Sequence, residues 1–189
     1  KLCNEHQHLK DEFGGECPMY GRGGTHNMSR YVPFDIYGEK HPEWYAYCKD
    51  LDYKTIDLLN GLTPDGKLDD SIEESVAKVV IQELKKDIIA NPSMRYFQFE
   101  QEDFSEPLHE YEDDPIKAGI LKKYGRSGIL IRFCNMLATE LQTWADKELN
   151  GRKIYIVTFA YCHTRVAPVI EENGVVKPID ETVVAVDNV

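Results

Sequence analysis

Basic residues are scarce in this chain of 189 residues: 22 lysines and arginines stand against 33 aspartates and glutamates, a formal net charge of −11. Phosphate recognition needs a dense basic face, so this balance argues against nucleic acid as a partner. Long apolar runs are also missing. The longest lies around Ile154–Cys162, far short of the roughly 20 residues that span a bilayer. The sequence therefore predicts neither nucleic-acid binding nor membrane insertion.

Cysteine is sparse as well. The five cysteines are Cys3, Cys17, Cys48, Cys134 and Cys162. They form no CxxC pair, and an odd, widely spaced set argues against both a zinc ribbon and a disulfide framework. Cys3 with His6 and His8 loosely suggests a metal site, but no fourth ligand follows at a suitable spacing. We expect no metal and no organic cofactor.

The remaining composition suits a globular domain, with 42% hydrophobic and 29% charged residues. Apolar periodicity predicts two long helices, at about residues 70–90 and 128–149. β-branched and aromatic runs predict strands at about residues 55–59, 94–99, 153–161 and 182–186. We expect residues 1–33, which glycine pairs interrupt, to be loop-rich, and residues 41–47 to form a short helix.

The first long helix is predicted from a single apolar stripe. The stripe consists of Ile72, Val76, Val79, Val80, Leu84 and Ile88. Ser71 with Glu74, or equally Asp70 with Glu73, would form a capping box at its start. Ser127 is the expected cap of the second helix.

Strands and helices alternate in this prediction, which indicates βαβ units and a parallel sheet. The expected fold class is α/β, a partial or complete (β/α)₈ TIM-barrel-like sheet with flanking helices. About four strands are found, whereas a complete barrel has eight in about 250 residues. We therefore interpret residues 1–189 as a single α/β domain. It would be part of a longer barrel whose remaining strands lie in the parent chain, or else an open sheet.

Polar residues follow three of the predicted strands. The segments are Glu100-Gln101-Glu102-Asp103, Tyr161-Cys162-His163-Thr164 and Asp187-Asn188. In parallel α/β folds the active site lies at the carboxyl ends of the strands. We therefore expect these three segments to converge on a common hollow at one edge of the sheet.

The acidic segment is the most informative of the three. Side chains alternate along a strand, so one face would carry Tyr96, Gln98, Glu100 and Glu102. Phe97 and Phe99 would face the other way, toward helices. Clustered carboxylates repel, so at least one should have a raised pKa, as glycoside hydrolysis requires of its acid. The alternative is a solvated acidic loop continuous with Glu106–Asp114, which composition alone favours.

Other candidates also have a functional and a structural interpretation. His163 could bind a ligand or relay a proton, although a single histidine is more often structural. Trp44, Tyr45 and Tyr47 could stack on sugars, although at helical spacing they more often belong to a core. Gly21–Gly24 is not a phosphate loop, because no GK[ST] follows it.

Several segments, in order along the chain, carry a family resemblance. They are Thr25-His26-Asn27 with Val32-Pro33, His41-Pro42-Glu43-Trp44-Tyr45-Ala46, the strand end Glu102-Asp103, Phe133-Cys134-Asn135, Phe159-Ala160-Tyr161-Cys162-His163-Thr164 with Ala167-Pro168, and Asp187-Asn188-Val189. Together they resemble the ordered pattern of the domain of unknown function 4838 family. The set runs from about His26 to Val189, and it is more specific than the HPEWYA segment by itself.

The resemblance implies a (β/α)₈ barrel related to glycoside hydrolase families 20, 67 and 163, in a bacterial protein that degrades complex glycans at the cell surface or outside the cell. The expected activity is hydrolysis, of the retaining type, of a glycan containing N-acetylhexosamine or uronic acid. Glu102 would be the general acid, Asp103 would orient the substrate or a second carboxylate, and Glu100 would be the reserve acid. The sugar-binding residues would be His26, Trp44, Tyr161, His163, Asp187 and Asn188.

One departure from the family pattern lies after the acidic strand end. Many members carry closely spaced cysteines there, whereas Phe104–Gly119 has none, so a loop or metal site built on cysteine is not expected. Two alternatives to the enzyme remain: a non-catalytic carbohydrate-binding barrel, and a structural α/β domain whose acidic loop contacts other proteins.

Overall fold

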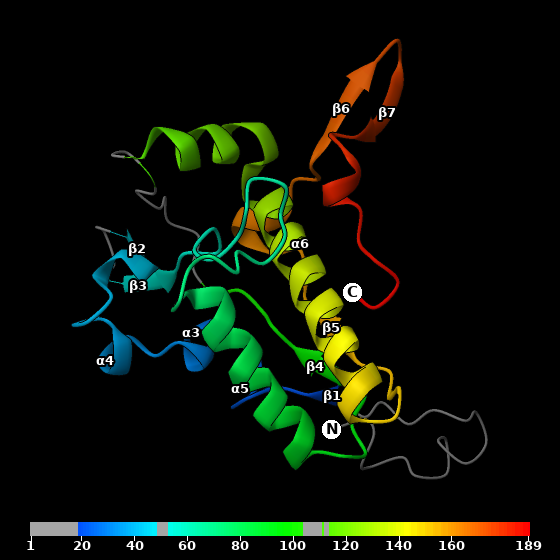
Figure 1. Ribbon diagram of the computed structural model, residues 1–189. Coiled ribbons are helices and arrows are strands. Elements are labelled where there is room, and N and C mark those ends of the chain that lie inside the picture. The colour runs from blue at the N-terminus through cyan, green and yellow to red at the C-terminus, as the bar shows by residue number, and fades with distance from the viewer. Residues whose placement is uncertain (1–18, 49–52, 104–110, 112–113) are drawn as a thin grey trace.

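A three-stranded parallel sheet organises the fold (Figure 1), in the order β1 (Met19–Tyr20), β4 (Tyr96–Gln98) and β5 (Tyr155–Val157). The computed structural model describes residues 19–48, 53–103, 111 and 114–189. Helical segments connect β1 to β4 and β4 to β5, so the predicted parallel sheet with helical crossovers is confirmed. The loop-rich prediction for residues 1–33 missed β1, and residues 1–18 lie outside the described part of the chain.

The central strand β4 separates an apolar face from a polar one, as the alternation predicted. Phe97 and Phe99 are fully buried, while Tyr96 is exposed and Gln98 is half-buried. The ring of Phe99 stacks on that of Phe133, with 5.3 Å between centroids. The apolar face of the sheet therefore packs on helices.

The helix α5 (Val76–Ala90) begins later than predicted. Its first N–H groups are satisfied by Ser75 Oγ, which accepts from Lys78 N, and by Asn60 Oδ1, which accepts from Val76 N at 2.9 Å. Because these acceptors stand beside Val76, the helix starts there, and the predicted capping boxes at residues 70–74 are wrong. Ile72 of the predicted stripe lies outside the helix.

The helix α6 (Pro115–Glu148) begins earlier than predicted. Asp114 caps it by accepting from Ile116 N and Lys117 N, and Gly125 breaks it with a non-helical backbone (φ 65°, ψ 178°). The predicted start at residue 128 corresponds to the segment after this break. Ser127 does not cap that segment through its hydroxyl, which donates to the carbonyl of Val166.

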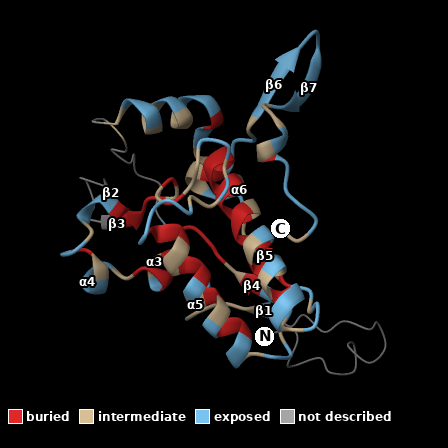
Figure 2. Ribbon diagram, in the orientation of Figure 1, coloured by how far each residue is buried: buried red, intermediate tan, exposed pale blue. Residues whose placement is uncertain are grey.

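The core lies between α5, α6 and the sheet. Figure 2 shows the buried residues of both helices on the sides that face each other and the strands. Val76, Val80, Leu84 and Ile88 of the predicted stripe are all fully buried. None of the helices in the described ranges has both the length and the apolar character needed to cross a membrane.

Two antiparallel hairpins stand outside the parallel sheet. In the first, a 3₁₀ turn at Pro42–Trp44 leads into β2 (Tyr45–Cys48), which pairs with β3 (Tyr53–Ile56). The predicted helix at residues 41–47 is thus replaced by one turn and a strand. The predicted strand at residues 55–59 overlaps β3 but does not join the parallel sheet.

The second hairpin, β6 (Val169–Glu172) with β7 (Val175–Pro178), was not predicted. Its turn residues Asn173 and Gly174 both have positive φ, at 53° and 76°. An Asn-Gly pair is the preferred turn of a two-residue hairpin, so the sequence did hold a signal for it. The hairpin projects from the body of the molecule (Figure 1).

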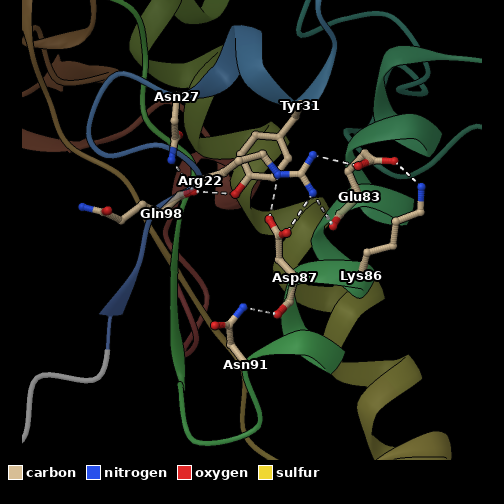
Figure 3. Close-up of polar contacts among 8 residues, drawn as sticks. All are labelled: Arg22, Asn27, Tyr31, Glu83, Lys86, Asp87, Asn91 and Gln98. Carbon is tan, nitrogen blue, oxygen red and sulfur yellow. Dashed lines mark hydrogen bonds and ion pairs between the residues drawn. The ribbon is translucent and has the colours of Figure 1, made fainter.

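Arg22, just after β1, ties the sheet to α5 (Figure 3). Its guanidinium donates to both carboxylate oxygens of Asp87, at 2.8 and 2.9 Å, and to Oε2 of Glu83 at 2.7 Å. It also lies over the ring of Tyr31, 4.7 Å from the centroid. This network fixes the carboxyl end of β1 against the helix.

Candidate functional site

The polar segments that follow β4 and β5 lie side by side. The side chain of Gln101 joins them: its amide nitrogen donates to the carbonyl of Tyr161 at 2.5 Å, and its amide oxygen accepts the hydroxyl of Thr164. Two of the three predicted strand ends therefore meet, because β4 and β5 are neighbouring parallel strands.

Asn27 extends the sheet beyond β1. Its side chain donates to the carbonyl of Gln98 at 3.1 Å (Figure 3) and accepts the N–H of Glu100 at 3.0 Å. Its own N–H donates to the carbonyl of Glu100 at 3.1 Å. A buried asparagine thus takes the place of a neighbouring strand and holds the start of the acidic segment in an extended path.

Glu102 is buried and oriented by a backbone donor. Its Oε1 accepts the N–H of Ser29 at 2.6 Å, at the start of the short helix α3 (Met28–Tyr31). The same side chain lines a cavity of about 60 Å³, whose wall also contains His163, Tyr111 and Arg126. The strand-end carboxylate and the imidazole therefore share one hollow, as predicted for this pair.

That cavity is small. Its volume of about 60 Å³ has room for about two water molecules, whereas ligand pockets measure about 300–1,000 Å³. A second hollow of about 450 Å³ adjoins it, since Arg126 and His163 line both. The second hollow lies along the break in α6 at Gly125 and the base of the β6–β7 hairpin.

The carboxyl group of Glu100 is buried and has a raised pKa. It is only 3% exposed; Oε1 accepts from the Gln98 amide at 2.9 Å, and Oε2 has no hydrogen-bond partner among the described residues. Burial raises the pKa of Glu100, while hydrogen bonds from the His26 backbone and the Gln98 side chain oppose the rise. A raised pKa was predicted here, but its main cause is burial and not repulsion between carboxylates. Glu100 does not line the cavity.

Asp103 and Tyr161 form a pair at the exposed rim. A hydrogen bond to Asp103, followed by one to Cys162, raises the pKa of the Tyr161 phenol to about 12. Nδ1 of His26 bonds to the carbonyl of Gln101 at 2.8 Å, and its ring lies 5.6 Å from that of Tyr161. Because a carbonyl only accepts, Nδ1 of His26 carries the proton. Three predicted residues therefore meet here, next to the cavity and not inside it.

Three predicted sugar-binding residues lie elsewhere. Trp44 is 2% exposed in the core, and the ring of His41 stacks on it at 3.9 Å.

The predicted strand at residues 182–186 is wrong, because a 3₁₀ turn at Glu181–Val183 leads into an irregular segment. That segment runs back along β5, where the carbonyl of Asn188 accepts the N–H of Ile156. The predicted convergence of Asp187 with Glu102 and His163 is therefore wrong: Asp187 is exposed, and neither it nor Asn188 lines the cavity.

Other wall residues of the cavity were missed by sequence reasoning. Tyr111 stood in the segment interpreted as an acidic loop, and Arg126 stood just before the predicted start of the second helix. No local pattern marks either one, because folding brings them to Glu102 from separate elements.

Metal ligands do not gather in the described part of the chain. No three histidine, cysteine, aspartate or glutamate side chains there are close enough to hold an ion. Cys3, His6 and His8, the loose suggestion from the sequence, lie outside the described residues. Cys134 and Cys162, the cysteines whose side chains are described, are both free thiols.

The fold and the site define an α/β protein whose polar residues gather at the carboxyl edge of a short parallel sheet. The sequence model of the domain of unknown function family DUF4838 matches residues 4–179. The chain therefore belongs to this family, as the resemblance indicated. No curated protein and no solved structure matches the chain.

Proposed function

We propose that this chain carries the strand-end carboxylates of a glycoside hydrolase that acts on a glycan containing N-acetylhexosamine or uronic acid. The proposal rests on one observation: Glu102 and His163, from the segments that follow two neighbouring parallel strands, line the same cavity at the carboxyl edge of the sheet. That edge is where parallel α/β folds place their active sites.

Glu102 is the proposed general acid, which protonates the glycosidic oxygen as the bond breaks. The substrate acetamide or a second carboxylate takes the anomeric carbon, and water then displaces it to release the sugar. The N–H of Ser29 fixes its carboxyl group beside the cavity. Asp103, with the hydroxyl of Tyr161, orients the sugar at the rim, and Glu100 is the reserve acid because burial raises its pKa. The sugar ring occupies the hollow of about 450 Å³, and the glycosidic oxygen that it carries enters the cavity of about 60 Å³ beside Glu102.

The sheet is proposed to be part of a (β/α)₈ barrel completed by further strands of the parent chain. One face of the sheet supports this idea: Tyr96 is exposed there, stacked on Tyr155 with 4.9 Å between ring centroids. Parallel sheets are almost always covered on both faces, so this aromatic face calls for a covering layer.

A non-catalytic carbohydrate-binding domain is the second candidate. The small volume of the cavity at Glu102 favours it, since a carboxyl group that only binds a sugar hydroxyl needs no space for a leaving group or an attacking water. Binding of a glycan without hydrolysis separates this candidate from the enzyme.

The test is hydrolysis of fluorogenic methylumbelliferyl glycosides of N-acetylglucosamine and of glucuronic acid, and of a released N-glycan. Glu102→Gln should lower turnover at least about a hundredfold, because a general acid contributes about that much. The folding loss should be small, since the Gln oxygen can still accept the N–H of Ser29. Glu171→Gln, an exposed substitution on β6, is the matched control and should leave turnover unchanged.

Near-normal turnover by a folded Glu102→Gln protein would remove Glu102 from the mechanism. A wild-type chain that binds these glycans by calorimetry but does not hydrolyse them would support the binding domain instead. A chain that does neither would contradict both.

A further inference from the structure

A further buried carboxylate, outside the acidic segment, lies next to the cavity, and no sequence motif pointed to it. Asp57 follows β3 and is 3% exposed. Its Oδ1 accepts the hydroxyl of Tyr111 at 2.5 Å and the N–H of Leu59 at 2.8 Å, and its Oδ2 accepts Nζ of Lys117 at 2.6 Å. Both oxygens are therefore engaged by donors.

These groups come from separate parts of the fold. The N–H of Asp57 donates to the carbonyl of Trp44 at 2.7 Å, so the β2–β3 hairpin fixes the carboxylate. Lys117 lies in the first turn of α6, whose cap Asp114 accepts its N–H. Asp57 therefore connects the hairpin, α6 and Tyr111 at one point.

Tyr111 is held in a costly backbone conformation. Its φ is 65°, in the left-handed region that bulky residues avoid. Two contacts hold the side chain in place: the hydrogen bond from its hydroxyl to Asp57, and the ammonium of Lys117, which lies 5.6 Å from the ring centroid. Strained residues persist where the surrounding structure over-determines them, and such sites concentrate around ligands.

The side chain held in this way lines the cavity that Glu102 and His163 line. Neighbours of Asp57 on β3 and after it, Ile56 and Leu58, contribute to the same wall. A buried ion pair by itself is weak evidence for a role in stability, because desolvation offsets much of the attraction. Its position behind a cavity residue indicates a role in shaping the cavity.

We propose that Tyr111 contacts the bound sugar and that Asp57, with Lys117, is a positioning residue that holds the Tyr111 ring at the cavity wall. This assignment rests on the proposed function, since the sugar in question is the one whose bond Glu102 would cleave. The proposal adds Tyr111, a cavity residue that does not belong to the segments after β4 and β5, together with Asp57 and Lys117, which hold it in place.

The test compares Tyr111→Ala and Tyr111→Phe with wild type on the methylumbelliferyl glycoside that the wild-type chain cleaves. Tyr111→Ala should raise KM about tenfold, a typical effect of truncating an aromatic contact, with a smaller change in kcat. Tyr111→Phe keeps the ring but loses the bond to Asp57, so its KM should rise less. Asp57→Asn should raise KM in the same direction.

Tyr45→Phe is the matched control, because that tyrosine also donates its hydroxyl, in its case to the backbone carbonyls of Val32 and Pro33, but lines no part of this cavity. Its KM should equal that of the wild type. The change in its melting temperature shows how much stability is lost when a tyrosine hydroxyl no longer donates its hydrogen bond. The Tyr111 variants keep the test valid if Asp57→Asn does not fold.

An unchanged KM in a folded Tyr111→Ala protein overturns the assignment. If Glu102→Gln abolishes hydrolysis while Tyr111→Ala behaves as wild type, this inference fails and the proposed function stands. If the wild-type chain neither cleaves nor binds these glycosides, both fail together.

Discussion

Asn27 and Glu100, 73 residues apart in the sequence, bind each other through side chain and backbone: the N–H of Glu100 donates to Asn27 Oδ1 at 3.0 Å, and the N–H of Asn27 donates to the carbonyl of Glu100 at 3.1 Å. Strand β1 ends at Tyr20, so a buried side chain continues the hydrogen bonding that the strand does not reach. This contact holds the acidic segment at the cavity.

Asn27→Ala should therefore destabilise the protein strongly. It leaves the N–H of Glu100 without its side-chain partner, whereas the carbonyl of Gln98 keeps the hydroxyl of Tyr31. A buried unsatisfied group costs about 1–3 kcal/mol, so we expect a loss of about 2 kcal/mol in the free energy of unfolding, measured by urea denaturation. Gln82→Ala, on the exposed side of α5, should change it by less than about 0.5 kcal/mol. A loss below 1 kcal/mol for Asn27→Ala would show that water replaces the side chain.

Glu100→Gln should stabilise the protein in a pH-dependent way. Burial raises the pKa of Glu100 above its ordinary value of 4.5, so the unfolded chain ionises at lower pH than the folded one. The contribution of Glu100 to stability is thus fully present below the unfolded pKa and is lost as the pH rises through the folded pKa. Glutamine does not ionise, so the variant should gain in free energy of unfolding at pH 7 and show no gain near pH 4.

Urea denaturation at both pH values measures this difference. Glu140→Gln, which removes a carboxylate that is not among the buried residues of α6, is the control measured at the same two pH values. The free energy of unfolding of Glu100→Gln minus that of wild type is the quantity to compare. If this difference is smaller at pH 7 than at pH 4, burial of the Glu100 carboxylate is not the cause.

Arg22→Met should release α5 from the end of β1. The substitution keeps the aliphatic stem but removes the bonds to Asp87 and Glu83, whose carboxylates lie largely buried beside it (Figure 3). Breaking a completely buried ion pair lowers the free energy of unfolding by about 3–5 kcal/mol. Because Arg22 is partly exposed, we expect Arg22→Met to lower it by about 2 kcal/mol. Thermal unfolding of Arg22→Met measures this loss, and Arg95→Met, a substitution of an exposed arginine, is the control.

The double variant with Asp87→Asn should lose less than the sum of the two single variants, because the residues share one ion pair. Strict additivity would mean that the pair seen in Figure 3 does not contribute to stability.

Local signals predicted much of the secondary structure. The apolar stripe of α5 and the alternation along β4 are both visible in the sequence, because neighbouring residues carry them. The predictions failed where distant residues decide. The start of α5 depends on Asn60, and the segment after Thr182 does not form a strand, because it packs back along β5.

The sequence by itself determined the parallel βαβ character, the acidic end of β4 and the family, since these depend on residue order and periodicity. Only the tertiary structure decided which of those polar groups share a cavity. It joined Glu102 to His163, left Asp187 outside, and added Tyr111, held by Asp57 and Lys117. The physical reason is that a cavity is made by side chains from separate elements, and no local sequence pattern encodes which of them meet.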